Sequence, residues 1–424
     1  MTDAVPPSRG MARLRIACAV VVAVSLTTSR FGMQLGAIYG ILFLLASRLF
    51  DGPLPSSPLD RPGLALLGAA WLSLAFAPGG FESAKTAGSW WVWLTGWVAF
   101  HGLRGESAAR RTVQALLWCA ASAAVLGLVQ AGLGVFPAGA WLHPQAGPLP
   151  PPAPGAPGHF AATGWFDSRV TFGLVMMFPF CWQMAIGWEA RRPLLRWALW
   201  AGAALAWLAM LASYTRAAPA AAAGAGFVLA ARSGGRLGWR RAVYWLPPLL
   251  AGALLILAVP GLWDRARQSF ERNRDWGRLA LWHTALDLAA RRPLLGVGYG
   301  NFKREALPLI EERVARMGER RFGGVVAWAH NDLLTMLAEC GLAGAFALCW
   351  LLVVFFRESG RNYARLKPDD VWRRGFVRGS RYAVAALILT SMFHDNFYHG
   401  EISFTLWFAM GAALAMGRRP EETP

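Results

Sequence analysis

Several arginines and one histidine stand where long apolar stretches of this sequence begin or end. Arg169 opens one stretch, Arg216 separates two others, and Arg278 opens a segment with helical spacing. His330 precedes a further apolar stretch and is followed at once by Asn331. Ionisable groups beside long apolar segments are costly and usually serve a function, so these positions are the first candidates for a site.

A second set of polar residues closes a later apolar stretch. It consists of His394 and Asp395, with His399 shortly after them. Arginine binds phosphate through a fixed fork of donors and keeps its charge, whereas histidine can take a proton from a hydroxyl near neutral pH. Together these residue types favour transfer of a group from a phospholipid-like carrier to an acceptor alcohol.

Each of these residues also has a simpler explanation. Arg169 and Arg216 are equally well explained as interfacial anchors that extend to lipid phosphates. Arg278 alone fits a solvated loop residue, and His399 fits an ordinary interface histidine. His330 is hardest to explain in this way, because the polar residues that follow it would enter the boundary with it.

Other catalytic chemistries lack their motifs in this sequence. It contains no Ser-x-x-Lys, Gly-x-Ser-x-Gly or His-Glu-x-x-His motif and no phosphate-binding loop. No carboxylate pair or histidine cluster has the spacing of divalent-cation ligands. The five cysteines form no Cys-x-x-Cys pair, which gives no support to a zinc site or a disulfide framework. The sequence therefore predicts a reaction that uses neither metal nor nucleotide.

The composition indicates a membrane protein. Of the 424 residues, 55% are hydrophobic and only 16% are charged, whereas soluble domains have about 25% charged residues. A net charge of +18 in such a chain reports topology and contact with anionic lipid more often than nucleic-acid binding. We therefore expect an all-α, polytopic membrane protein.

About twelve segments are long and apolar enough to cross a bilayer. They are 12–28, 31–49, 62–78, 85–103, 111–136, 168–188, 194–212, 217–231, 241–262, 332–356, 380–396 and 402–417. This predicts nine spans in 1–262, a helical extracytoplasmic lid in 263–328 and three spans in 329–424. Within the lid, helical stretches are expected at 277–288 and 307–317, and a charge-free, proline-rich outer loop at 137–159.

The distribution of positive charge predicts the orientation. Apart from the long segment 263–328, most Lys and Arg residues fall on the same side as the N-terminus. Because cytoplasmic loops carry the excess of Lys and Arg, both termini should be cytoplasmic. The lid and the candidate residues would then face the outside.

Three motifs carry a resemblance to a known family. They are Arg278–Trp282, then Arg292–Phe302 with its Gly-Val-Gly-Tyr-Gly turn, then Ala329–Leu334 continuing to Gly344. In order and spacing they resemble the signature of the O-antigen ligase and O-antigen polymerase superfamily. A fourth stretch, Gly164–Val170, resembles a conserved region of that family in part, with Ser168 and Val170 where asparagines are usual.

The resemblance implies an inner-membrane glycosyltransferase with its site on the periplasmic face. Its members transfer glycan from undecaprenyl pyrophosphate, without nucleotide or metal, and a ligase passes it to a sugar hydroxyl of lipid A–core oligosaccharide. The essential histidine of the family maps onto His330, and its essential arginines map onto Arg216 and Arg278. Arg169 is a further candidate for pyrophosphate binding, and the candidate supporting residues are Asn331, Gly296, Gly298, Asp395 and His394.

Several alternatives stay open. A polymerase would use a second carrier-bound repeat unit as acceptor, and a protein O-oligosaccharyltransferase would use a protein hydroxyl. A solute transporter, of the kind suggested for bicarbonate, would instead place buried ions at the bilayer midplane. A lipid-binding scaffold without catalysis would make His330 dispensable. The glycines at 296 and 298 could serve close approach to a phosphate or to the lid, or simply a tight turn.

Overall fold

The computed structural model describes residues 9–27, 30–51, 54–77, 88–103, 106–134, 151–154, 158–232, 276–316 and 327–417. Within these ranges the protein is helical, with no β-strand and one isolated bridge between Pro152 and Phe160. The expected all-α fold is therefore confirmed. The expected span at 241–262 and most of the proline-rich loop lie outside the described residues.

The helices in chain order are α1 (Arg9–Ser25), α2 (Arg30–Asp51), α3 (Asp60–Ala75), the 3-10 helix η1 (Gly88–Trp93), α5 (Leu94–Gly102), α6 (Glu106–Leu133), α8 (Arg169–Glu189), α9 (Pro193–Ala212), α10 (Ala217–Arg232), α14 (Trp276–Arg291), α15 (Phe302–Arg316), α16 (Asp332–Arg365), α17 (Val371–Thr390) and α18 (Gly400–Met416). Every expected span other than 241–262 overlaps one of these helices. In the described residues, five candidate spans are long and apolar enough to cross a membrane, and they are Phe31–Leu49, Ala108–Leu133, Arg169–Glu189, Pro193–Ala212 and Asp332–Arg365. Together with the shorter apolar helices Ala217–Val228 and Gly400–Met416, they identify a polytopic membrane protein.

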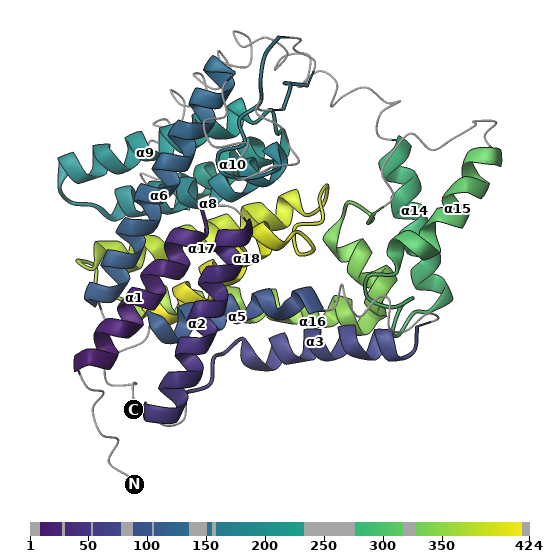
Figure 1. The fold of residues 1–424 in the computed structure, drawn as a ribbon, viewed down its shortest axis with the longest axis horizontal. Coiled ribbons are helices and arrows are strands. Elements are labelled where there is room, and N and C mark those ends of the chain that lie inside the picture. Colours follow the sequence, from purple (N-terminus) through teal and green to yellow (C-terminus); the bar gives the residue numbers. More distant parts are fainter. Residues whose placement is uncertain are drawn as a thin grey trace.

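The bundle is organised around α8 and α18, whose side chains are almost entirely buried. The helix α8 packs on α17 and α9, and α18 packs on α5 (Figure 1). Small residues allow the closest crossing, since a Cβ atom added at Gly411 would lie 1.9 Å from the carbonyl oxygen of Gly96. The two helices can therefore meet backbone to backbone.

The lid helices α14 and α15 stand to one side of the bundle (Figure 1). Their predicted helical character is confirmed, although α15 begins at Phe302 rather than at 307. They share a small apolar cluster of their own, separate from the bundle core, which includes Leu281, Ala285, Leu288, Phe302, Ala306 and Ile310. This cluster gives α14 and α15 a fixed mutual position, and contacts between α14 and α16 join them to the bundle.

The expected span at 380–396 is displaced, because α17 covers Val371–Thr390 instead. Its first turns carry arginines that lower the local hydropathy, but Arg374 and Arg378 both pair with Glu189 at 3.1 Å, so the helix extends through them. At the other end the Asn396 amide donates to the carbonyl of Leu387 and to the hydroxyl of Thr390. Residues 391–399 therefore form turns rather than the last part of a helix.

These connections place the candidate residues at one end of the bundle. Glu189, at the end of α8, meets Arg374 near the start of α17, so the start of α8 and the end of α17 lie at the opposite end. The start of α16 lies there too, because the Asp332 amide donates to the carbonyl of Ser391 at 3.0 Å. The fold thus gathers the beginnings of α8 and α16 and the turns after α17.

Candidate functional site

His330 occupies a constrained turn directly before α16. Its φ of 52° lies in the left-handed region, which is unusual for a residue other than glycine. Asn331 follows as the N-cap of α16 and accepts a hydrogen bond from the amide of Leu334 at 3.1 Å. Such backbone strain persists only where neighbouring contacts hold it, and it is common at functional sites.

Asp332 supplies those contacts. Its carboxylate accepts hydrogen bonds from the backbone amides of Asn396 at 3.0 Å and Phe397 at 3.1 Å. The side chain is buried, so these bonds to its oxygens are shielded from water. They tie the turn that carries His330 to the segment that carries Asp395.

The imidazole Nδ1 of His330 lies 3.1 Å from Oδ2 of Asp395. The His330 side chain is 34% exposed, whereas that of Asp395 is 0% exposed, so only the histidine can meet a substrate. Asp395 is held from its other oxygen, which accepts a hydrogen bond from the Thr335 hydroxyl at 2.8 Å. The Nδ1–Oδ2 approach is close enough for an ion pair but does not have the geometry of a hydrogen bond.

His394 lies at the centre of the polar group. Burial lowers the pKa of its imidazole to about 4, and the charges of Arg278 and His330 act in the same direction. Asp395 and His399 also lie close enough to affect this pKa, the carboxylate raising it and the second histidine lowering it. At neutral pH His394 is therefore a neutral donor and acceptor beside the cation of Arg278.

Arg278 reaches this group from the lid. It lies in the first turn of α14, and its guanidinium carbon is 5.9 Å from the centre of the Phe393 ring, in a cation–π contact. The Trp282 ring, one turn later, lies 6.4 Å from the same phenylalanine. The structure thus brings together Arg278, His330, His394 and Asp395, as well as His399.

Arg169 and Arg216 form a second group at the same end of the bundle. The Nη1 of Arg169 donates to the carbonyls of Tyr214 at 3.0 Å and Ser213 at 3.3 Å, in the turn that precedes Arg216. Tyr214 also has a left-handed φ of 54°. The two guanidinium groups lie close enough to repel each other electrostatically. Arg169 therefore holds the turn that presents Arg216.

The glycine-rich turn before α15 packs against a break in α16. Gly341 interrupts α16 with φ 63° and ψ −161°, and a Cβ atom there would lie 2.4 Å from the carbonyl carbon of Leu294. Conversely, a Cβ atom at Gly296 would lie 2.3 Å from the carbonyl carbon of Glu339. A Cβ atom at Gly298, whose φ is 101°, would lie 2.4 Å from that of Ala77. The close approach served by Gly296 is to the backbone of α16.

Glu339 was not among the residues expected at the site, yet it supports the lid. Its Oε1 accepts a hydrogen bond of 3.0 Å from the amide of Phe302, the first residue of α15. The amide of Gly298 donates to the Glu339 carbonyl at 2.9 Å. Thr335 was missed as well, since a threonine inside an apolar span is ordinary in sequence and only the fold places it against Asp395.

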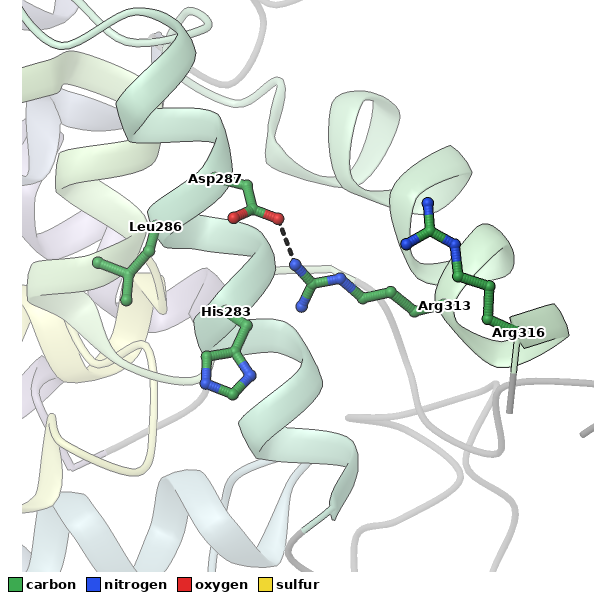
Figure 2. Close-up of a pocket in the computed structure, with 5 residues that line it drawn as sticks. All are labelled: His283, Leu286, Asp287, Arg313 and Arg316. Carbon is green, nitrogen blue, oxygen red and sulfur yellow. Dashed lines mark hydrogen bonds and ion pairs between the residues drawn. The ribbon is translucent and has the colours of Figure 1, made fainter. Parts of the chain in front are cut away.

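An open groove of about 510 Å³ lies elsewhere on the lid (Figure 2). It is lined by His283 and Asp287 of α14 and by Arg313 of α15, and Asp287 and Arg313 form an ion pair. Asp287 is nine residues beyond Arg278, which places the two about half a turn apart around the helix. The groove therefore lies on a different face of α14 from the polar group around His330.

The polar group has the parts of a group-transfer site. It offers a partly exposed histidine beside a buried carboxylate, together with an arginine that can bind an anion. A histidine so placed can accept a proton from a hydroxyl, with the carboxylate stabilising the imidazolium that forms. The second arginine pair at the same end of the bundle adds further positive charge.

Comparison with known proteins finds a family match over the part of the chain that carries Arg278 and His330. The model of the O-antigen ligase family matches residues 201–349, a range that includes Arg216, Arg278 and His330. Members of this family are glycosyltransferase-like enzymes that act on a lipid-linked glycan and an acceptor. A search of curated proteins found no match. Residues 201–349 of this membrane protein therefore match the O-antigen ligase family, which belongs to the O-antigen ligase and O-antigen polymerase superfamily.

Proposed function

We propose that this protein is an O-antigen ligase, which transfers glycan from undecaprenyl pyrophosphate to a sugar hydroxyl of lipid A–core oligosaccharide. The observation that carries the proposal is the convergence of His330, Asp395 and Arg278, which come from the start of α16, the turns after α17 and the lid. The match to the O-antigen ligase family supports glycosyl transfer between a lipid-linked glycan and an acceptor, and the choice of lipid A–core as that acceptor is our proposal.

His330 acts as the general base in this proposal. Its Nδ1 faces Asp395, so Nε2 is the nitrogen left to accept the proton of the acceptor hydroxyl. A positioned base of this kind contributes typically about 10²–10⁴-fold to the rate. The buried carboxylate holds the ring orientation and stabilises the imidazolium once the proton has arrived.

Arg278 and Arg216 bind the donor pyrophosphate and stabilise the charge that develops as it leaves. Pyrophosphate is a good leaving group, so no acid has to protonate it, and displacement in one step inverts the anomeric carbon. The hydrogen bonds of Arg169 to the carbonyls of Ser213 and Tyr214 support a positioning role beside any direct contact with phosphate. Arginine then supplies the positive charge for which other enzymes use a metal ion, so we propose a reaction without metal or nucleotide.

The site faces the periplasm in this proposal, and both termini are cytoplasmic. Support comes from the basic residues at the other end of the bundle, where Arg361, Arg374 and Arg378 lie on α16 and α17. An excess of arginine marks the cytoplasmic side of an inner-membrane protein. The end that carries His330 is then the outer one.

The test is transfer by the purified full chain, with carrier-linked glycan and lipid A–core, in EDTA and without nucleotide. We expect His330→Asn to abolish transfer while donor binding persists, because asparagine tolerates the left-handed backbone at this position. Arg278→Ala and Arg216→Ala should lose both donor binding and transfer, with partial rescue by lysine, which cannot make the bidentate fork. Full activity of His330→Asn would refute the base assignment.

Deletion of the gene separates ligase from polymerase. Loss of a ligase leaves core lipid without long glycan while carrier-linked polymer accumulates. Loss of a polymerase instead leaves core that bears a single repeat unit, and that result would overturn the acceptor proposed here.

A further inference from the structure

Trp328 lies two residues before His330 and contacts the same turns as the histidine. Its ring centre is 5.5 Å from that of His399, at an interplanar angle of 63°, and 6.1 Å from that of Tyr398. The Trp328 side chain is only half-buried, and His399 is exposed. An aromatic ring and an imidazole are therefore both accessible beside His330.

The base of this aromatic pair is rigid. Tyr398 stacks on Tyr299 of the glycine-rich turn, with ring centres 5.3 Å apart and an angle of 16°. Its hydroxyl also lies beside the buried carboxyl group of Glu339. Trp328 thus rests on a ring that is held by the lid turn and by α16, so its own orientation is restricted.

The surroundings of His330 differ in chemistry from one flank to the other. On the flank of α14, Arg278 contacts the ring of Phe393, and the arginine is suited to phosphate. On the flank of α18, Trp328 contacts His399, and His394 lies close enough to interact electrostatically with both Arg278 and His399. One flank therefore suits an anion, whereas the other suits a neutral ring with hydroxyl groups.

A pyranose ring has that mixed character. Its C–H faces are apolar and pack on aromatic rings, while its hydroxyl groups need hydrogen-bond partners such as imidazole nitrogens. We propose that Trp328 and His399 form the subsite that holds the acceptor sugar and presents its hydroxyl to His330. This inference rests on the proposed glycosyl transfer and adds the residues that recognise the acceptor.

The experiment measures KM for each substrate and kcat with the full chain in detergent micelles. Trp328→Ala should raise the acceptor KM roughly threefold to tenfold, the range that the loss of one aromatic contact gives, and leave the donor KM unchanged. Trp328→Phe should restore most of the affinity, since it keeps an aromatic face. Trp372→Ala is the matched control, because Trp372 is also half-buried but lies at the other end of α17.

A second measurement keeps this subsite separable from the catalytic proposal. Binding of delipidated core oligosaccharide to the protein, without donor, should weaken in Trp328→Ala and His399→Ala but not in Trp372→Ala. If Trp328→Ala and His399→Ala bind the oligosaccharide as tightly as the wild type does, Trp328 is a membrane-interface anchor and the subsite is refuted. The same conclusion follows if the donor KM and the acceptor KM rise together. Failure of wild type to transfer glycan would instead count against the proposed function.

Discussion

The buried carboxylate of Asp395 lies 3.1 Å from the Nδ1 of His330, although the two residues come from opposite ends of the α16–α17 hairpin in sequence. Thr335, one turn into α16, donates to the other oxygen of the carboxylate at 2.8 Å. Its hydroxyl accepts in turn from the amide of Ala329 at 3.1 Å. Hydrogen bonds through Thr335 thus join Asp395 to the backbone before His330, and the imidazole lies against the same carboxylate.

Removing the charge of Asp395 should therefore impair catalysis more than binding. We expect Asp395→Asn to lower kcat by roughly 10-fold to 10⁴-fold with little change in either KM, since the imidazolium loses its counter-charge. Thr335→Val should act in the same direction but more weakly. Steady-state kinetics would check this, with Asp287→Asn of the lid as the control. An unchanged kcat in Asp395→Asn would contradict a catalytic role for the pairing of His330 with Asp395.

The break in α16 should tolerate no side chain. Gly341→Ala would place a Cβ atom 2.4 Å from the carbonyl carbon of Leu294, at a φ of 63°. The backbone conformation alone should lower the free energy of unfolding by about 1–3 kcal/mol, and the clash should lower it further. Thermal unfolding in detergent, compared with Gly68→Ala, would measure it, because an added Cβ atom at Gly68 in α3 meets nothing within 4 Å. Equal stability of the two variants would show that the break can relax.

Acid should destabilise the fold through His394. Burial and the charge of Arg278 lower its folded-state pKa from 6.5 to about 4, so the unfolded chain binds the proton first as the pH falls. Above pH 6.5 the histidine is neutral in both states and does not affect the free energy of unfolding. Between pH 6.5 and 4 that free energy falls progressively. His394→Asn should flatten this part of the stability curve, measured by thermal unfolding at several pH values. A wild-type curve in His394→Asn would refute the assignment.

The orientation can be checked with introduced cysteines in a chain whose five native cysteines are replaced. Glu311 is exposed on α15 of the lid, and Lys367 is exposed in the connection between α16 and α17. A membrane-impermeant thiol reagent should label Glu311→Cys in intact spheroplasts and Lys367→Cys only after permeabilisation. The reverse pattern would put His330 on the cytoplasmic side and exclude a periplasmic reaction.

Much of the candidate site could be predicted from residue types and their positions relative to apolar segments. Long apolar runs specify membrane helices because backbone groups in lipid must be satisfied within the helix. Arg278 and His330 stood out because charged and polar groups at such boundaries are costly. The two helices of the lid could also be predicted, because the spacing of apolar residues along a helix is visible within a short stretch of sequence.

The tertiary structure decided which of these residues meet. Hydropathy placed 391–396 inside a span, whereas the Asn396 amide bonds end α17 at Thr390 and leave Asp395 free to face His330. Gly296 packs against the backbone next to Gly341, and Gly341 packs against the backbone next to Gly296. No local sequence pattern predicts this contact. The sequence thus determined which polar groups lie at the ends of the apolar segments. Which of these groups pair with each other depends on contacts between segments that are distant in sequence, and only the packing of the helices determines those contacts.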